Sequence, residues 1–596
     1  MAGRDQERAG RSRNGCWTCR DKKVKCDEAR PECQRCTRLA LHCDYSYRPR
    51  KRYTRRHPPK AQAQAAADDT RSATASASID PVTPSTTQGQ EPAPVEHAAP
   101  ATPVPWHTLP PTPRDGDGGH IETDCSYDPL LVEGLSPSCL SIVGPAEREA
   151  IDCYRTVIGG TVDSKDAQYS MPTIIWGIAK SRPMVLHMIC ALGSLQLSYQ
   201  ATSQTEELGH QLRVAGARHY GTSMRLLAHA IHDTSESSLL DATLATLWLM
   251  IIYEQKFGDG WGEGLNTHLI GAASVLRSRL GNLKTLHALP DRDEEFITRS
   301  SFLDQSPVNR WGISPFSGRL IVWISFLDAG AAFFGFGGDF NQSLGEVMGG
   351  LAEDPTVSRL RGFACIHRYS ALTSSTIWGA AYPQEQLLED LENRESFYFY
   401  GQIGQLRFII SQLAAAHRAQ DDEATFGDLA QNAARALRVV GEKYSELVEV
   451  APRLDFRSAT GREKRFISNL RFIIPYYHAV VTCYFRITRR HSPPETGQLD
   501  ALQQIMVLAY RAYADEGDDA MARIAWPLFI AALETTDLVH RDWILTRFSR
   551  LRQRGENYRR AYAVLLRASQ AEDADGVPRQ SYLDVLAESN IDKFVI

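Results

Sequence analysis

The sequence predicts three parts: a small metal-stabilised cluster with two short helices, a disordered linker, and a large all-α domain. Two observations predict this order. Half of the twelve cysteines lie within the first 43 residues, at regular spacing. Beyond residue 137, apolar residues recur at helical spacing and strand-like alternation is scarce. The chain of 596 residues is long enough for several domains.

The first part spans residues 16–45, where the pattern Cys-x2-Cys-x6-Cys occurs twice. Its six cysteines are Cys16, Cys19, Cys26, Cys33, Cys36 and Cys43. This stretch is too short to bury a hydrophobic core, so something other than burial must hold it. Zinc suits soft sulfur ligands and prefers a tetrahedral shell. The spacing therefore predicts a zinc cluster.

The number of cysteines sets how the metal is shared. Six thiolates satisfy two tetrahedral zinc ions only if two thiolates bridge both metals. The repeat makes Cys16 and Cys33, the first cysteine of each half, the natural bridges. One zinc then adds Cys19 and Cys26, and the other adds Cys36 and Cys43. Metal binding supplies most of the folding free energy of such a module, so a chelator should unfold it.

A disulfide framework is the main alternative for these cysteines. The first residues, 1–13, are polar and charged without an apolar run, which indicates no secretory signal and a reducing compartment. We therefore expect thiolate ligands rather than disulfides. His42 stands beside Cys43, but the cysteine set is already complete, so we expect a surface histidine. The other cysteines lack metal spacing and indicate free thiols: Cys125, Cys139, Cys153, Cys190, Cys365 and Cys483.

Residues 16–45 resemble the fungal binuclear zinc-cluster transcription factors. The likeness includes Lys-Val-Lys-Cys-Asp-Glu at residues 23–28 and the loop at Pro31. It implies that the helix after the second cysteine enters the DNA major groove and reads a CGG-type triplet. A lysine ammonium donates well to guanine O6 and N7, which agrees with that role. Asp21 and Asp44 depart from the family's usual residues; the first bears on phosphate affinity.

Carried over residue by residue, the resemblance implies four contacts in the basic run. Lys22 and Lys23 contact bases, while Arg20 and Lys25 face phosphates. A second basic run supplies Arg48, Arg50, Lys51 and Arg52, which indicate a nuclear-import signal, phosphate contacts or both. A solvated charge run is the alternative for this second run.

Charge is distributed unevenly along the chain. Residues 1–60 hold 18 Lys and Arg against 7 Asp and Glu, a net charge of +11, whereas the whole chain carries −5. We predict a disordered basic arm at residues 1–15 and a basic linker at residues 46–60. A basic N-terminal segment in a chain that is acidic elsewhere favours nucleic-acid binding by that segment.

Residues 61–136 are predicted to form the disordered linker. They are rich in Ala, Ser, Thr, Pro and Gln, a composition that cannot bury enough surface to fold. There is no leucine from Asp44 to Thr108, so no leucine heptad follows the cluster. Homodimerisation beside the cluster is therefore unsupported: either the protein reads one triplet as a monomer, or a later domain pairs it.

Residues 137–596 are predicted to be all-helical. Two apolar stripes at helical spacing consist of Val185, Met188, Leu192 and Leu195, and of Tyr220, Met224, Leu227 and Ile231. Leu240–Tyr253 is apolar nearly all round and predicts a central buried helix. Leu320–Gly338 has the composition nearest to a membrane span, but Asp328 lies at its middle and glycines crowd its end. We therefore expect a buried helix and no membrane partner.

This domain is similar to the fungal-specific transcription factor domain. The resemblance lies in residues 253–259, 268–272, 526–534 and 540–544. It implies a regulatory role: holding an activator in check, sensing a metabolite or contacting partners.

Motifs of common enzyme classes are missing from the sequence. There is no Gly-x-Ser-x-Gly elbow, no His-Glu-x-x-His and no phosphate loop that ends in Gly-Lys-Ser/Thr. His229 and His232 are three residues apart, with Asp233 next, but a surface or core pair explains them more simply than a metal site. Residues 572–594 alternate acidic and apolar side chains as activation segments do; we favour a last helix at Tyr582–Ala587.

The sequence thus predicts a nuclear, sequence-specific DNA-binding regulator of RNA polymerase II genes in a fungus, and not an enzyme. Double-stranded DNA is the expected partner, together with transcription co-regulators. The alternative is a zinc-cluster co-regulator that acts through protein contacts. A helical enzyme with an appended cluster would need turnover by the helical body, and no residue set suggests it.

Overall fold

The computed structural model divides the chain into two compact units, residues 1–119 and residues 120–596. The structure describes residues 16, 18–19, 26–30, 33–39, 41–43, 133–159, 165–200, 206–231, 237–279, 313–348, 355–419, 422–489, 495–573, 581–588 and 592–596. In these ranges the regular elements are helices, and no strand occurs. The predicted all-α class of the large domain is confirmed.

Several predicted features lie outside the described residues. These are the basic arm, the basic linker, the disordered linker up to residue 132, and every predicted DNA contact: Arg20, Lys22, Lys23, Lys25, Arg48, Arg50, Lys51 and Arg52.

The first unit contains α2 (Gln34–Arg38). This helix begins after Cys33 because the Cys33 side chain accepts the backbone N–H of Cys36 at the helix start. Residues 18–19 are also helical, which is where the predicted basic helix begins.

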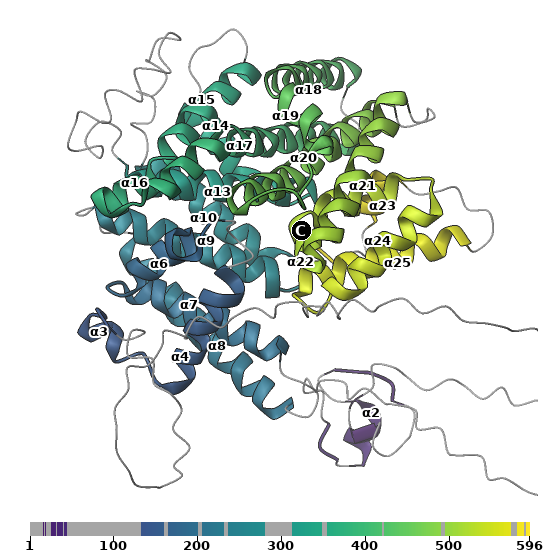
Figure 1. Ribbon diagram of the computed structural model, residues 1–596. Helices are drawn as coiled ribbons and strands as arrows, with labels where there is room; N and C mark the ends of the chain where they lie inside the picture. Colours follow the sequence, from purple (N-terminus) through teal and green to yellow (C-terminus); the bar gives the residue numbers. More distant parts are fainter. Residues whose placement is uncertain are drawn as a thin grey trace, which may run out of the picture. The chain divides into compact units, whose positions relative to one another are not determined.

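The second unit is a stack of helices (Figure 1). Its first half contains α3 (Pro137–Leu140), α4 (Pro145–Cys153), a π-helical turn (Tyr154–Ile158), a 3₁₀ turn (Ala167–Tyr169), α6 (Met171–Ala179), α7 (Pro183–Gln200), α8 (Glu206–Ala230), α9 (Ser237–Phe257), α10 (Glu263–Arg279), α13 (Pro315–Phe333) and α14 (Asp339–Met348). Its second half contains α15 (Pro355–Ser370), α16 (Thr373–Trp378), α17 (Gln384–Ala419), α18 (Glu423–Lys443), α19 (Ser445–Val450), α20 (Gly461–Thr488), α21 (Thr496–Glu516), α22 (Asp518–Arg523), α23 (Ala525–Glu534), α24 (Leu538–Leu551), α25 (Glu556–Asp573) and α26 (Tyr582–Ala587), with further 3₁₀ turns at Gly379–Ala381 and Ala451–Arg453.

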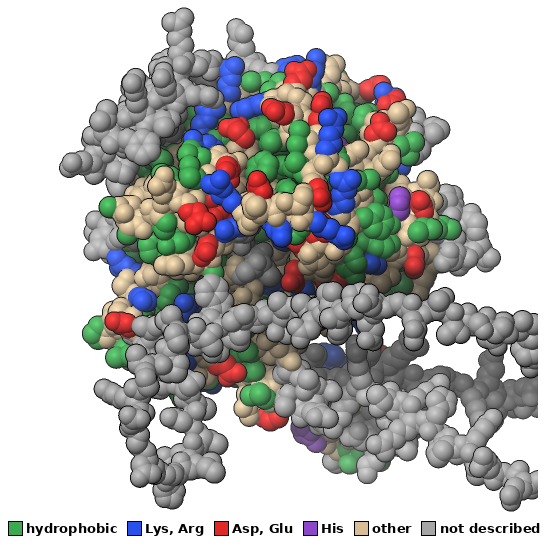
Figure 2. All heavy atoms as spheres, viewed as in Figure 1, with side chains coloured by type: hydrophobic (Ala, Val, Ile, Leu, Met, Phe, Trp, Pro, Cys, Tyr) green, Lys and Arg blue, Asp and Glu red, His purple; other side chains and the backbone are tan. Residues whose placement is uncertain are grey.

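The core runs through α9, α13, α17 and α20. α13 contacts both α9 and α17, and α17 contacts α20. Every residue from Ala242 to Ile252 in α9 is buried, so the predicted central helix is confirmed. On the face shown in Figure 2, acidic and basic side chains are interspersed over the helical unit.

The apolar segment 320–338 is a core helix followed by a turn. α13 ends at Phe333, and Gly335, Gly337 and Gly338 then take positive φ angles of 85°, 77° and 99°. Buried Asp328 accepts the N–H of Gly338 at 2.8 Å and that of Asn341 at 2.9 Å, which fixes the turn into α14. Among the described helices, α13 is long and apolar enough to cross a membrane, but 72% of that window is buried inside the protein. The prediction of a buried helix is confirmed.

One predicted stripe is confirmed and the other is wrong. All four residues of the α7 stripe are buried, from Val185 to Leu195. Of the predicted stripe, Leu227 is buried and Tyr220 is half-buried against the core, while Met224 is 42% exposed and Ile231, just after the end of α8, is 38% exposed. The buried residues of α8 are small ones seven positions apart, Gly209, Gly216 and Ser223, together with Leu227. Small residues let α8 approach α7 closely, and this turns the larger side chains outward.

The last predicted helix is confirmed. α26 spans Tyr582–Ala587, and Tyr582 is buried against Phe333 with the two rings stacked at 5.4 Å. Its N-terminal Ser581 and Asp584 form a capping box. These contacts make the segment part of the helical core rather than a free acidic tail.

Candidate metal centre

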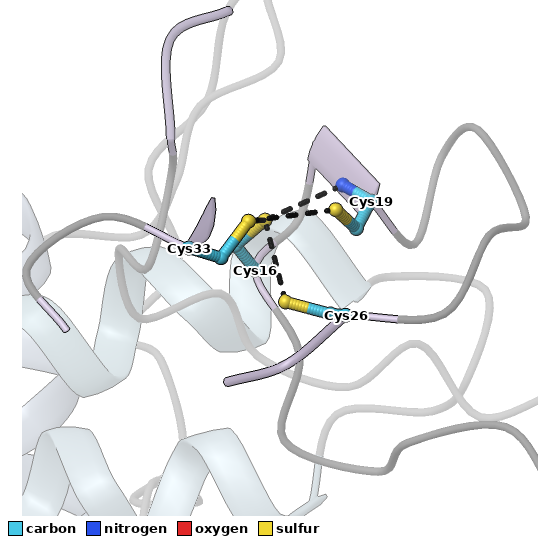
Figure 3. A group of neighbouring side chains, drawn as sticks. All are labelled: Cys16, Cys19, Cys26 and Cys33. Carbon is cyan, nitrogen blue, oxygen red and sulfur yellow. Dashed lines mark hydrogen bonds between the residues drawn. The ribbon is translucent and has the colours of Figure 1, made fainter. Parts of the chain in front are cut away.

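The six cysteine sulfurs of the first unit lie close together. The Sγ of Cys16 is 3.7 Å from that of Cys33 and 3.9 Å from that of Cys26. Figure 3 shows these side chains and Cys19 pointing toward one another. Zn–S bonds of about 2.3 Å at tetrahedral angles place two sulfurs about 3.8 Å apart. The sulfurs are therefore spaced as ligands of a common metal ion.

Two groups of four sulfurs can each hold one ion. In each group, all Sγ atoms lie within 4.8 Å of one another. One group contains Cys16, Cys19, Cys26 and Cys33, and the other contains Cys16, Cys33, Cys36 and Cys43. Cys16 and Cys33 belong to both groups, which is the sharing that the cysteine count predicts.

The sequence repeat appears again in the geometry. The N–H of Cys19 donates to the Sγ of Cys16, and the N–H of Cys36 donates to the Sγ of Cys33, both at 3.4 Å. Each predicted bridging sulfur therefore accepts a hydrogen bond from the backbone N–H three residues along its own half. Such donors stabilise a thiolate that two cations share.

The outer sulfurs are held in a similar way. The N–H of Glu28 donates to the Sγ of Cys26 at 3.4 Å, and the N–H of Cys33 donates to the Sγ of Cys43 at 3.2 Å. Glu28 itself takes a positive φ of 60°, which is uncommon for a residue other than glycine.

The thiol environments differ within the cluster. Burial raises the pKa of Cys16 and of Cys43. Burial also acts to raise the pKa of Cys33, but hydrogen bonds from the Cys36 N–H and from neighbouring thiols outweigh it and bring the pKa to about 6. The two predicted bridging cysteines therefore differ, because their surroundings lower the thiol pKa at Cys33 and raise it at Cys16.

The contacts of two residues near the cluster could not be predicted from the cysteine spacing. The Nη1 of Arg35 lies 3.8 Å from the Sγ of Cys19, where its positive charge offsets thiolate charge. Asp27 accepts the N–H of Gln34 through Oδ2 at 3.1 Å and ties the loop after Cys26 to the start of α2. Arg35 lies between Cys33 and Cys36 in the second repeat. Its position in the sequence does not predict a contact with Cys19 of the first repeat.

The histidines near the candidate sites are placed as expected where the structure describes them. His42 is exposed, and its backbone carbonyl accepts the Thr18 hydroxyl at 2.6 Å. His229 is exposed on α8, whereas His232 and Asp233 lie outside the described residues.

Comparison with known families agrees with both units. The fungal Zn(2)-Cys(6) binuclear cluster domain matches residues 14–52. The fungal specific transcription factor domain matches residues 172–596, which is more than half of the chain. The chain belongs to the fungal zinc-cluster transcription regulators. This zinc-cluster regulator therefore carries a binuclear zinc cluster at its N-terminus, as its cysteine count predicts, and it is a regulator rather than an enzyme.

Curated relatives of the zinc-cluster regulator match it over short segments. It is 46% identical over 63 residues to the aspercryptin biosynthesis cluster-specific transcription regulator atnN of Emericella nidulans, which is 10% of each chain. It is 56% identical over 39 residues to sterol uptake control protein 2 of Candida albicans, 6% of each chain. It is 60% identical over 35 residues to transcriptional regulatory protein UME6 of Saccharomyces cerevisiae, 6% of this chain and 4% of that one.

The alignments with these relatives thus cover a tenth or less of their length. No solved structure gives a significant match to the zinc-cluster regulator.

Proposed function

We propose that the chain binds specific DNA sites in the nucleus and regulates RNA polymerase II genes, with the helix after Cys19 reading a CGG-type triplet. The observation that carries this is the grouping of Cys16, Cys19, Cys26 and Cys33 around one metal position. Cys19 and Cys26 flank the basic run 20–25, so the same ion anchors both ends of the run. An anchored helix presents its lysines to base edges at low entropic cost.

The charge distribution supports a phosphate-binding head. Residues 1–60 carry a net charge of +11 in a chain of net charge −5. Phosphate contacts supply affinity and register, and base contacts supply sequence choice. We assign Lys22 and Lys23 to bases, and Arg20, Lys25, Arg48, Arg50, Lys51 and Arg52 to phosphates.

The test compares Lys23→Ala with Arg52→Ala in the full-length chain. Loss of a base contact should weaken binding to a CGG-containing duplex by about 1–3 kcal/mol and leave binding to a scrambled duplex nearly unchanged. Loss of a phosphate contact should weaken both alike and reduce the salt slope by about 1. Binding is measured by fluorescence anisotropy at several salt concentrations. Equal losses on both duplexes for Lys23→Ala would overturn the base-reading role.

A further inference from the structure

Arg407 is a buried cation in the middle of α17. Arg407 is only 2% exposed, and neither its Nε nor its Nη2 has a hydrogen-bond acceptor in the described structure. These two atoms form one edge of the planar guanidinium. That edge is the one on which a carboxylate accepts two parallel hydrogen bonds. A buried charge without a partner is costly, so its presence requires an explanation.

Two other arginines of the same domain, the buried Arg471 and the half-buried Arg486, pair with carboxylates. Arg471 donates to Asp515 at 2.6 Å, and Arg486 donates to Glu534 at 2.7 Å. Glu534 also accepts the N–H of Tyr582 at 3.0 Å, so its oxygens are already engaged. Arg471 also leaves its Nε without an acceptor, but it has a carboxylate partner, whereas Arg407 leaves both Nε and Nη2 without an acceptor in the described structure.

The surroundings of Arg407 are largely aromatic, and its ionisable neighbours include Tyr400, Tyr476 and Cys483. The Trp526 ring of α23 lies 4.0 Å from the guanidinium carbon, and the Phe333 ring of α13 lies 5.6 Å from it. The indole N–H of Trp526 is also buried without an acceptor. Burial lowers the pKa of Arg407 to about 10. The side chains of Arg407 in α17 and Trp526 in α23 are therefore in direct contact, and each has at least one buried N–H group without an acceptor.

Gly330 and Val595 also lie beside the Arg407 side chain. A Cβ at Gly330 would lie 2.9 Å from Cγ1 of Val595 and 3.2 Å from Nη1 of Arg407, so the absent side chain leaves room for both. Val595 belongs to segment 592–596, which is held by a hydrogen bond from the Lys593 N–H to the Gly260 carbonyl at 2.7 Å and by one from Asn557 to the Val595 carbonyl at 3.0 Å. Nε and Nη2 are shielded from solvent, so a ligand must part these residues to reach them.

We propose that Arg407 anchors an effector site for a small organic monocarboxylic acid inside the helical domain. The acid's two oxygens bond the Nε and Nη2 edge, and Trp526 supplies a further donor. One cation among largely aromatic neighbours matches one negative charge, whereas a phosphate dianion would bring a second charge that no neighbour described here neutralises. The proposal concerns the helical domain alone and is independent of the DNA sequence that the cluster reads.

Cation–π contact with Trp526 is the competing explanation for Arg407. It is worth up to about 2 kcal/mol for a desolvated pair, and it leaves the Nε and Nη2 donors unmatched. The two explanations give the same unliganded structure, but only an effector site binds acids.

The experiment measures thermal unfolding of the zinc-loaded full-length chain with sodium formate, acetate, hexanoate and benzoate at constant ionic strength. Formamide, acetamide, hexanamide and benzamide serve as neutral controls of nearly the same shape. We expect at least one acid to raise Tm in a saturable manner while its amide does not, because ligand binding to the folded state stabilises it. If no acid raises Tm, formate included, the proposal is wrong.

Variants separate binding from stability. Arg407→Met should abolish the acid-induced rise in Tm and leave the unliganded Tm equal or higher, because an unpaired charge is removed. Arg471→Met is the matched control: it breaks a pair with Asp515 and should lower Tm while keeping the acid response. Trp526→Phe keeps a ring but removes the N–H, and should weaken acid binding about tenfold. An unchanged acid response in both Arg407→Met and Trp526→Phe would overturn the proposal.

Discussion

Cys16 and Cys33 differ from the other cluster cysteines because each belongs to both groups of sulfurs. A residue that serves two metal ions has a larger effect when removed than one that serves a single ion. This difference is the residue-scale test of the cluster.

We predict that Cys16→Ala loses both zinc ions, because neither tetrahedral shell can then be completed. Inductively coupled plasma mass spectrometry of the purified full-length chain would give zinc per chain. Cys139→Ala is the control, since Cys139 is buried in the helical unit and should keep both ions. One full zinc retained by Cys16→Ala would refute the bridging role.

The sequence predicts the cluster's sulfurs well because ligand spacing is local and few metals suit six thiolates. It does not predict Arg35 near Cys19, since that contact depends on how the two halves fold against each other. It also gives no sign that Arg407 is unpaired, because a partner for an arginine comes from distant elements.

At the scale of elements, close packing of α4, α7 and α8 depends on small residues. A Cβ at Gly193 in α7 would lie 1.8 Å from the carbonyl oxygen of Ala150 in α4, whereas one at Gly221 in α8 would meet nothing within 4 Å. These glycines offer a matched pair of substitutions.

We predict that Gly193→Ala destabilises the protein by about 3 kcal/mol or more, because backbone must move. Gly221→Ala should stabilise it by about 0.5–1 kcal/mol, since alanine favours helix more than glycine does. Urea unfolding followed by circular dichroism gives both values. Similar stability for the two variants would show that α4 and α7 are not packed as described.

Hydrophobic patterns predict α7 and α9 but misplace the buried face of α8. Periodicity counts large apolar residues, and α8 buries Gly209, Gly216 and Ser223 instead. Helices that approach closely through small residues therefore give a weak or misleading apolar stripe.

For the whole molecule, buried histidines link stability to pH. Burial lowers the pKa of His268 and His478 to about 4 and that of His367 to about 3, whereas a histidine in the unfolded chain titrates near 6.5. The unfolded state therefore binds these protons first as pH falls. Their contribution to stability is present above about pH 6.5 and is lost as the pH drops toward 4.

We predict that His478→Phe reduces the pH dependence of the unfolding free energy between pH 6.5 and 4 by about one proton. The His478 Nε2 has no hydrogen-bond partner in the described structure, so the substitution removes titration with little loss of contact. Urea titrations at several pH values give the slopes, and an unaltered slope for His478→Phe would contradict this account.

The order of parts along the chain is readable from composition because the cluster, the low-complexity linker and the helical body differ so strongly. The arrangement of the helices cannot be read from composition, because it depends on side-chain contacts between residues hundreds of positions apart, such as Phe333 with Tyr582.

The most direct test of the central claim is selection of bound duplexes from a random pool by the zinc-loaded full-length chain. The account predicts enrichment of a CGG-type triplet, and paired or single triplets would show whether two copies bind together. Two zinc ions per chain with no enriched sequence would contradict DNA reading and leave a zinc cluster that contacts other proteins.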